Sequence, residues 1–493
     1  MKKFMLSTVC LGLLFASCSS DDDDGGLNQI QNPNPNPLSV SDFPNQNFMW
    51  QAMNLWYFWQ ADVTDLADDR FASNAEYAEY LSQNPDPRTF FFDELTFTED
   101  RFTFIDENYE NLVNSLAGVS KSNGMEFGLV RFSGDSDNIF GYVQYILPDS
   151  DASTKDIQRG EIFTRVNGTQ LTVNNFRGLL FTGSDTYTLG MANIVNGVVV
   201  DSNKEVSLTK VEGFQENPIL LAETLEVSGT KIAYLMYNRF LNEFDDQLNE
   251  AFAKFVADGA TEMVLDMRYN PGGSVNTSRL LSSMVHSTDE NKLYLRQRWN
   301  EKVQMQLSAA QLEDYFASTV NGAPLNSLNL TKLYVLATNS SASASELVMN
   351  GLDPYVDVVH IGETTSGKNE FSITLVADTG NSFIYNPNRE NQINPEVAWG
   401  LQPLVGRNEN ANGFFDYTAG LNPDIELEED LTNLCILGYV NEPLLARAIQ
   451  EITGTTTRRG FNVQMPAKTY ISSGAMTGMG DRMFLDKDLS LEK

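Results

Sequence analysis

The chain has 493 residues, of which 42% are apolar or aromatic and 20% are charged, so it is expected to fold into two to four domains rather than stay disordered. Its 33 basic and 66 acidic residues give a net charge of −33, which argues against nucleic-acid partners and against electrostatic binding to anionic lipid. The chain has only two histidines, His286 and His360. A histidine-rich metal site is therefore not expected, and a histidine-based catalytic triad would have few candidates.

Residues 1–17 have the pattern of a secretory signal peptide, with a lysine pair, an apolar stretch and then small residues. The tetrapeptide Phe-Ala-Ser-Cys that ends at Cys18 resembles a bacterial lipobox, which predicts that Cys18 carries lipid. We therefore expect the protein to be lipid-anchored to the bacterial outer membrane, on its periplasmic or cell-surface face. The alternative is an ordinary cleaved signal followed by a solvated acidic tail, "SSDDDD".

Residues 18–44 are predicted to form a lipid-anchored linker, which begins with the acidic run and continues over residues 27–43 with asparagine and proline, a composition typical of an extended, solvated spacer. The next region, 45–118, is expected to be helical because Met49, Met53, Trp56 and Tyr57 recur at helical spacing. The tryptophans near these positions could form a sugar-stacking platform, but the spacing favours a buried core.

Residues 119–214 contain short apolar or alternating runs separated by turn residues, which predicts a small β-domain. Its stretch "DIQRGEIFTRVNG" resembles part of a PDZ domain, with Glu161 in place of an aspartate. The corresponding peptide-binding edge would be Phe127, Gly128, Leu129 and Val130, whose amides could receive a chain-terminal carboxylate. A generic β-domain without a ligand is the alternative.

Residues 215–456 alternate strand-like and helix-like segments, which predicts an α/β core with a mainly parallel sheet. In the segment 245–259, the spacing places on one helical face the residues Leu248, Ala251, Phe252, Phe255 and Val256. Residues 457–493 form a predicted C-terminal tail without a functional signal.

The two histidines lie in apolar contexts and are expected to be structural. Acidic turns such as "GDSDN" lack the ligand spacing of an EF-hand and predict solvated turns rather than a calcium site.

Two strand ends in this core carry unusual sequences. An apolar strand ends in Asn270-Pro-Gly-Gly, so that bare amides at Gly272 and Gly273 could approach a ligand oxygen, although a tight turn is an adequate explanation. A second strand ends in "NSSASASE", where a serine at a helix start would lie in a positive field. Serine also caps helices routinely, so neither junction is decisive alone.

Lys368 lies in the loop "GETTSGKNEF" after the strand-like run "VDVVHIG". A lysine acts as a general base only when it is neutral, so its pKa would have to be lowered from about 10.4 toward neutrality, which burial can do. An exposed surface lysine is the alternative.

Taken together, Asp-x-Arg-x-Asn-x-Gly-Gly, Ser-Ala-Ser-Ala-Ser-Glu and Gly-Glu-x-Thr-x-Gly-Lys resemble, in this order, the C-terminal processing (tail-specific) serine peptidases. The resemblance implies a PDZ-like domain before a crotonase/ClpP-like core, and a Ser–Lys dyad. It makes Ser343 the nucleophile and Lys368 its base, with the amides of Ala344 and Gly273 as oxyanion donors and Gly272 allowing close approach. Glu346 matches a position that orients the dyad in some members, whereas Asn369 departs from the glycine found in many.

The resemblance implies a serine endopeptidase that cleaves partly unfolded proteins after recognising their C-termini, through an acyl-enzyme and without a metal or cofactor. Its partners would be protein or peptide substrates. One alternative is a non-catalytic surface lipoprotein that binds peptides or glycans, and another is a retired protease that serves as a scaffold.

Overall fold

The computed structural model describes residues 38–132, 136–458, 460–476, 480, 482–487, 489 and 491. The predicted signal peptide, Cys18 and most of the linker therefore lie outside the described residues. Within the described part of the chain, none of the helices combines the length and the apolar character that a membrane span requires.

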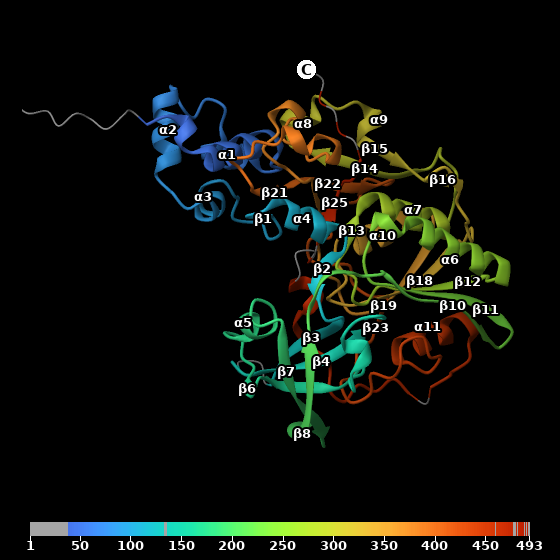
Figure 1. Cartoon of the computed structure of the whole chain (residues 1–493). Coiled ribbons are helices and arrows are strands. Elements are labelled where there is room, and N and C mark those ends of the chain that lie inside the picture. The colour runs from blue at the N-terminus through green and yellow to red at the C-terminus, as the bar shows by residue number, and fades with distance from the viewer. Residues whose placement is uncertain are drawn as a thin grey trace, which may run out of the picture.

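The α-helices, which Figure 1 labels together with the strands, are α1 (Pro44–Trp56), α2 (Asn74–Ser82), α3 (Pro87–Glu94), α4 (Tyr109–Leu116), α5 (Phe176–Leu180), α6 (Asp245–Asp258), α7 (Val275–Val285), α8 (Glu301–Gln304), α9 (Ala309–Leu312), α10 (Ala344–Leu352), α11 (Pro443–Thr453) and α12 (Ser473–Met476). The strands are β1 (Phe104–Asp106), β2 (Val119–Ser122), β3 (Met125–Arg131), β4 (Ile139–Ile146), β5 (Ile162–Val166), β6 (Thr169–Gln170), β7 (Thr186–Val195), β8 (Val198–Thr209), β9 (Val211–Gln215), β10 (Ile219–Val227), β11 (Thr230–Tyr237), β12 (Glu262–Asp266), β13 (Gly273–Ser274), β14 (Leu293–Trp299), β15 (Glu313–Tyr315), β16 (Thr319–Val320), β17 (Ala323–Pro324), β18 (Lys332–Ala337), β19 (Asp357–Gly362), β20 (Glu370–Ser372), β21 (Gly400–Gln402), β22 (Leu404–Asn410), β23 (Ile425–Glu426), β24 (Thr469–Ser472) and β25 (Met483–Phe484).

The central sheet has the order β10-β11-β12-β18-β19-β23, and its strands run parallel from β11 to β23. Both faces of this sheet are covered, because successive side chains of a strand point to opposite faces. In β11, Ile232 and Tyr234 pack into the apolar cluster that contains α11, whereas Ala233 and Leu235 pack into the cluster that contains α6 and α7. The predicted α/β class with a mainly parallel sheet is therefore confirmed.

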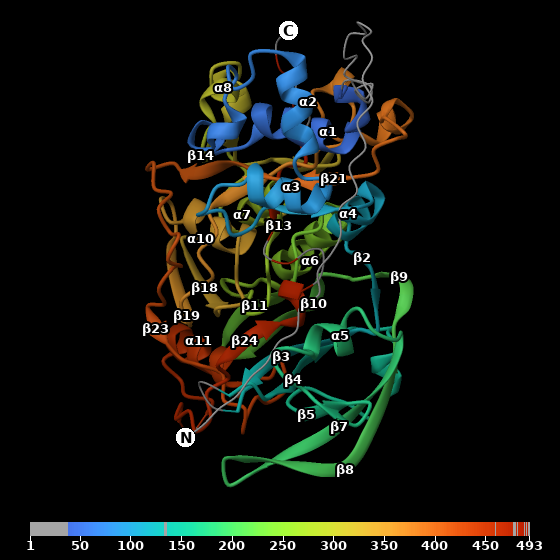
Figure 2. The same cartoon turned by 90° about the vertical axis from the view of Figure 1, so that its left-hand side faces the viewer.

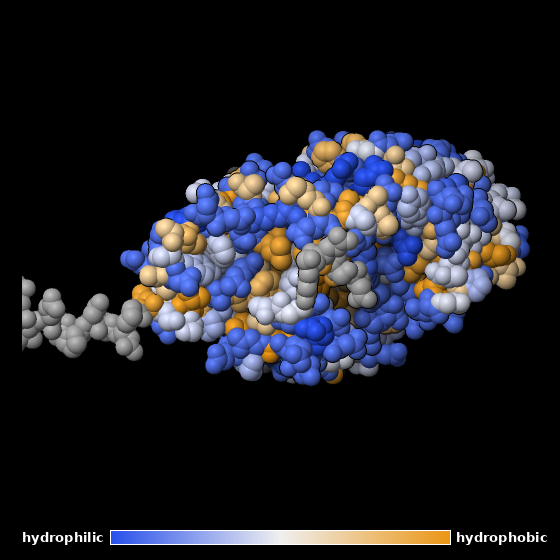
Figure 3. All heavy atoms as spheres, turned by 90° about the horizontal axis from the view of Figure 1, so that it is seen from above, coloured by the Kyte–Doolittle hydropathy of each residue, from blue (hydrophilic) through white to orange (hydrophobic). Residues whose placement is uncertain are grey.

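A second sheet, β13-β25-β20-β22-β14-β15, carries the N-terminal helices. Trp56 of α1 packs against Trp299 of β14 with ring centroids 5.8 Å apart, and its indole N–H donates to the Ser382 carbonyl at 2.7 Å. Met49, Met53, Trp56 and Tyr57 are fully buried, so these residues form the predicted core rather than an exposed sugar platform. The face in Figure 3 is mostly hydrophilic, as the charge of the chain leads one to expect.

A third sheet, β24-β3-β4-β5-β7-β8 with β6 paired to β5, lies at the lower end of the molecule in Figure 1. Its strands β3 to β8 come from the predicted β-domain, but β24 comes from the region predicted to be a C-terminal tail. β25, from the same region, joins the second sheet. The prediction of a separate tail over 457–493 is therefore wrong. Each strand is only two to four residues long and pairs with an edge supplied by distant chain, which leaves no local periodicity to detect.

The predicted apolar face of α6 is correct for Leu248, Phe252 and Phe255, which are fully buried. The prediction is wrong for Val256, which is 46% exposed. Val256 follows Phe255, which is fully buried, so it lies at the edge of the apolar stripe, on the side of α6 that faces solvent.

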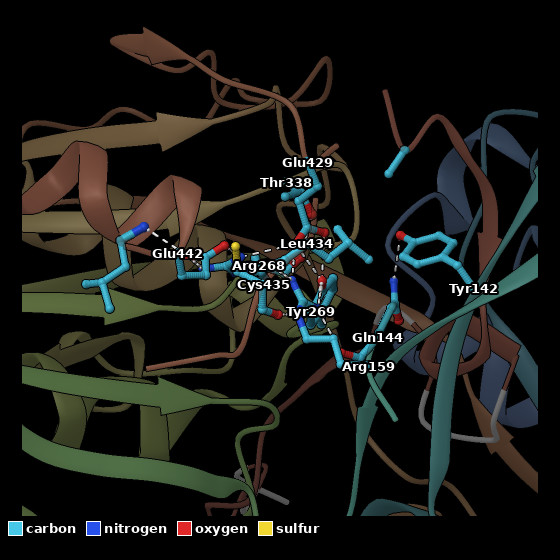
Figure 4. Close-up of polar contacts among 12 residues, drawn as sticks. Tyr142, Gln144, Arg159, Arg268, Tyr269, Thr338, Glu429, Leu434, Cys435 and Glu442 are labelled. Carbon is cyan, nitrogen blue, oxygen red and sulfur yellow. Dashed lines mark hydrogen bonds and ion pairs between the residues drawn. The ribbon is translucent and has the colours of Figure 1, made fainter. Parts of the chain in front are cut away.

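A buried ionic network joins the central sheet to the small β-domain (Figure 4). Arg268, which is fully buried, bonds both carboxylate oxygens of Asp266 and both of Glu442, and it also contacts Glu429 at 3.1 Å. Arg159, from the small domain, bonds Glu429 at 2.7 Å. Each cation thus has a carboxylate partner, which offsets the desolvation cost of burying it.

We predict that Arg268→Met destabilises the protein by about 3–5 kcal/mol, because it leaves Asp266 and Glu442 buried without their cation. Chemical denaturation monitored by fluorescence measures this loss. The matched control is Arg298→Met: Arg298 is half exposed and pairs with Glu409, and its loss should cost about 1 kcal/mol or less. Equal losses in the two variants would contradict the role of the network.

Candidate active site

The two unusual strand ends lie side by side in the structure. β12 and β18 are parallel neighbours, with Asp266 opposite Leu336, so the segments that follow them meet at the same edge of the sheet. The Asn270 carbonyl accepts hydrogen bonds from the Ala342 amide at 3.1 Å and from the Ser345 hydroxyl at 3.0 Å. The Asn270 side chain bonds the Gly272 amide at 2.9 Å. Asn270, whose role is not evident from the sequence, therefore holds the serine run against the glycine turn.

Ser343 lies at the start of α10 in a strained conformation. Its φ of 66° and ψ of −116° are outside the regions that residues with a side chain favour, and such strain persists only where the surroundings enforce it. The side chain is fully buried, and within the described part of the chain its hydroxyl has no hydrogen-bond partner. Ala344 follows as the first residue of α10, so its amide belongs to the positive end of that helix.

The Glu346 carboxylate connects the serine segment to the lysine loop. One of its oxygens accepts from the Ser343 amide at 2.7 Å and from the Lys368 amide at 2.9 Å. The other accepts from the Gly367 amide at 2.7 Å and from the Thr365 hydroxyl at 2.5 Å. All four partners are donors, so the ionised carboxylate matches them and a protonated one would not.

Burial raises the pKa of Glu346 to about 7, although the hydrogen bonds from Thr365, Lys368, Ser343 and Gly367 act to lower it. The carboxyl group is fully buried, so the charged form is costly without its donors. The position of Ser343 relative to the lysine loop therefore depends on a carboxyl group that titrates near neutral pH.

The glycine turn faces Ser343 directly. A Cβ placed on Gly272 would lie 2.5 Å from Ser343 Cβ and 2.9 Å from Ser343 Oγ, and Gly272 has a φ of 107°. Only glycine allows this approach. The Gly272 carbonyl and the Ser274 amide both bond Phe240. The amide of Gly273 therefore faces the opposite side, toward its register partner Met483 in β25.

Lys368 is fully buried, and its ammonium nitrogen lies 5.0 Å from the centre of the Phe102 ring. Arg101 donates to the Gly367 carbonyl at 2.7 Å, so the N-terminal region holds the lysine loop from outside. Phe102 and Arg101 were not anticipated from the sequence, because nothing local marks a residue that reaches a loop so distant along the chain.

The predicted peptide-binding edge, Phe127 to Val130, lies in β3 and is covered by β24. Thr469 is opposite Val130, and Ser472 is opposite Gly128. The Phe127 amide donates to the Ser473 hydroxyl at 2.8 Å. These residues therefore form a strand, but in this structure β3 lies between β24 and β4 and is not open to a peptide.

His286 and His360 are buried, at 9% and 4% exposure, and burial lowers the pKa of each imidazole. The ring Nδ1 of His286 lies 2.8 Å from the Leu330 carbonyl oxygen, and the ring Nε2 of His360 lies 3.3 Å from the Ala337 carbonyl oxygen, so backbone carbonyls hold both rings in place. Among the described residues, no cluster of three or more His, Cys, Asp or Glu side chains could hold a metal ion. Part of the acidic turn "GDSDN" lies outside the described residues.

Two family models match the chain. The model described as peptidase family S41 matches residues 231–402, and the model described as the peptidase S41 N-terminal domain matches residues 45–104. The first range contains the glycine turn, the serine run and the lysine loop. The second contains the Arg101–Phe102 segment that contacts the lysine loop.

Curated relatives share part of the chain. The "Probable CtpA-like serine protease" of Staphylococcus aureus (strain bovine RF122 / ET3-1) is 23% identical over 286 residues, which is 57% of this chain and 48% of the relative. The protein of the same name from Staphylococcus epidermidis is 24% identical over 229 residues, which is 45% of this chain and 40% of the relative. The chain thus spans about half the length of these relatives.

Among solved structures, a Bacteroides fragilis NCTC 9343 protein assigned to the S41 proteases matches with a TM-score of 0.63 and 27% identity. The match covers 82% of this chain and 97% of that one, so most of the fold has a counterpart. Together, these matches show that residues 45–104 and the core that contains residues 231–402 are similar to S41 serine peptidases.

Proposed function

We propose that the protein is a serine endopeptidase that hydrolyses peptide bonds of partly unfolded proteins, with Ser343 as nucleophile and Lys368 as general base. One observation carries the proposal: Glu346 ties the segments of Ser343 and Lys368 together, while Gly272 packs against the Ser343 side chain. A buried, strained serine beside a glycine turn and a buried lysine has no evident structural purpose.

The reaction proceeds in two halves. Neutral Lys368 removes the proton of Ser343 as its oxygen attacks the scissile carbonyl, and the carbonyl π-electrons move to the oxygen. The tetrahedral intermediate then collapses, the C–N bond breaks, and Lys368 returns the proton to the leaving amine. Water repeats the attack on the acyl-enzyme with Lys368 as base, releasing the acid and Ser343.

The oxyanion is stabilised by the amides of Gly273 and Ala344. The Gly273 amide faces away from Phe240, and the Ala344 amide lies at the positive end of α10. Fixed backbone donors of this kind act without reorganisation during the reaction, which is what gives them their catalytic effect.

The small β-domain would act as a PDZ-like module that recognises substrate C-termini at the β3 edge, and Cys18 would anchor the protein to the outer membrane through lipid. The support for the first is the antiparallel pairing of β3 with an extended segment. The support for the second is the lipobox-like sequence alone.

A non-catalytic peptide-binding lipoprotein is the competing function. It is disfavoured because a binder has no use for the serine, lysine and glycine segments that Glu346 and Gly272 hold together. A fluorophosphonate probe separates the two, since it modifies Ser343 in a peptidase and no residue in a binder.

We predict that Ser343→Ala and Lys368→Ala each lower the cleavage of an unfolded protein with an apolar C-terminus by roughly 10⁴-fold or more, because the nucleophile or its base is lost. A gel-based assay of substrate disappearance measures the effect, and circular dichroism checks that the fold is kept.

The matched control is Ser340→Ala, since Ser340 belongs to the same serine run but is partly exposed and lies outside α10, before the proposed nucleophile. This variant should cleave at the wild-type rate. Full activity in the Ser343 or Lys368 variant would rule out the dyad.

We predict that wild-type kcat falls as the pH drops below about 7, because the Glu346 carboxylate becomes protonated and loses its match to four donors. Glu346→Gln should lower kcat by roughly 100-fold with KM little changed. The NH₂ group of the glutamine replaces one carboxylate oxygen, so it faces two hydrogen-bond donors without being able to accept from them, and Ser343 and Lys368 shift relative to each other. The pH profile of kcat measured on both proteins tests this positioning role. If the kcat of Glu346→Gln still falls below about pH 7 as that of the wild type does, the positioning role of the Glu346 carboxylate is contradicted.

A further inference from the structure

The C-terminal segment, residues 467–476 and 482–487, contacts both places that a substrate would have to use. Its strand β24 pairs antiparallel with β3, with Ile471 opposite Leu129 and Ser472 opposite Gly128. Figure 2 shows β24 running alongside β3. The main chain of β3 that would receive a peptide is therefore already paired.

The side chains of β24 also occupy the positions that a bound peptide would fill. Ile471 and Met476 pack against the apolar cluster of the small β-domain. The Arg131 guanidinium lies 4.6 Å from the centre of the Tyr470 ring. The Ser473 hydroxyl accepts from the Phe127 amide at 2.8 Å and donates to Glu126 at 2.5 Å. Pairing along a strand edge with alternate side chains in apolar pockets is how extended peptides are recognised.

The second contact is at the active site. β25 inserts between β13 and β20, with Met483 opposite Gly273 and Phe484 opposite Ser372. The Ser372 hydroxyl donates to the Met483 carbonyl at 3.0 Å, and the Leu485 amide donates to the Ser372 carbonyl at 3.0 Å. β13 begins at Gly273, and β20 begins just after Lys368 and Asn369. β25 therefore fills the space between the glycine turn and the lysine loop.

This insertion brings main chain close to the proposed nucleophile. The point that a Cβ on Gly272 would occupy is 2.8 Å from the Arg482 carbonyl oxygen and 2.9 Å from Ser343 Oγ. Ser343 and Lys368 are both fully buried. A scissile carbonyl therefore cannot reach Ser343 until the segment around Met483 has moved.

We propose that the C-terminal segment is an intramolecular inhibitor that occupies the substrate path at the β3 edge and at the slot between β13 and β20, and that an extended peptide with a free C-terminus displaces it. This proposal rests on the proposed peptidase function. The occupant is this chain's own segment, and the competing ligand is the C-terminal end of an unfolded protein.

An open cavity beside the segment explains why a substrate can win this competition. It has a volume of about 210 Å³ and is lined in part by Phe127, Leu180, Phe181, Lys210 and Ser473. The C-terminal segment does not end at Ser473 but continues into α12, so it places no terminal carboxylate in the cavity. A substrate that ends there can place an apolar last side chain against the phenylalanines and its carboxylate near the Phe127 amide and Lys210.

The first test loosens the segment in the full chain. Ile471→Asp combined with Ser473→Ala places a charge in the apolar groove and removes the bond to the Phe127 amide. We expect kcat/KM for an unfolded substrate to rise on the order of ten-fold, because the state in which the C-terminal segment has left the substrate path becomes more populated. Labelling of Ser343 by a fluorophosphonate should accelerate equally. Lys468→Ser, an exposed position just before β24, is the matched control and should change neither rate.

The second test locks the segment, which guards against a loosened variant that misfolds. Thr469→Cys and Val130→Cys replace register partners of β24 and β3, whose Cα separation in an antiparallel pair suits a disulfide. A Cys435→Ser background removes the remaining free thiol of the described chain. The oxidised protein should cleave roughly ten-fold or more slowly than the same protein after reduction. Equal rates before and after reduction would overturn the proposal.

A binding measurement separates this proposal from the peptidase function. In a Ser343→Ala background, a dansyl-labelled peptide with the sequence of residues 467–476, AKTYISSGAM, should bind the loosened variant and not the locked one. If all variants cleave at one rate, the inhibitor is refuted and the peptidase stands. If none cleaves although the peptide binds as expected, the peptidase function fails, and the inhibitory role fails with it. A peptide that binds the locked and loosened proteins equally shows that β24 does not occupy the edge competitively.

Discussion

The buried guanidinium of Arg268 is the interaction on which the arrangement of the domains depends. It neutralises Asp266 at the end of β12 and Glu442 at the start of α11, and it shares Glu429 with Arg159 of the small domain. Burying these charges together is costly unless each meets its partners in good geometry, so the network fixes one relative placement of these elements. The Arg268 carbonyl also accepts from Thr338, which leads into the serine run. The same residue thus sets the position of both strand ends that form the active site.

The active site adds a second layer of constraint, which fixes reactive groups rather than domains. The Asn270 carbonyl accepts from the serine run, and the Glu346 carboxylate accepts from the Ser343 amide and from the lysine loop. Together these bonds hold Ser343 at a positive φ. Strain of this kind costs of the order of 1–3 kcal/mol and survives only when several bonds oppose its release. The backbone hydrogen bonds around Ser343 thus hold the proposed nucleophile in a conformation that it would not adopt by itself.

The sequence predicted the parallel sheet and the buried N-terminal helix from local periodicity. It placed the serine and glycine segments together only through the resemblance to a peptidase family, and the structure adds the reason, which is that β12 and β18 are parallel neighbours. The sequence could not predict Asn270 as a bridge or Phe102 as a neighbour of Lys368, since both depend on contacts between distant segments. The failure at residues 457–493 has the same origin. β24 and β25 are strands only because β3, β13 and β20 offer them edges, and nothing in "TYIS" or "MF" announces this.

Covering those edges solves a problem that every peptidase of extended chains must face. A site that binds substrate by main-chain pairing requires an unpaired strand edge, and unpaired edges also recruit the edges of other molecules and promote aggregation. The β3 edge is bordered by buried apolar residues such as Phe127 and Leu129, which makes the exposed form especially adhesive. A segment of the same chain can cover such an edge at a high effective concentration and still be displaced, because its two short strands make few main-chain bonds. In the proposed inhibitory role, the brevity of β24 and β25 is what lets one segment both protect these edges and release them.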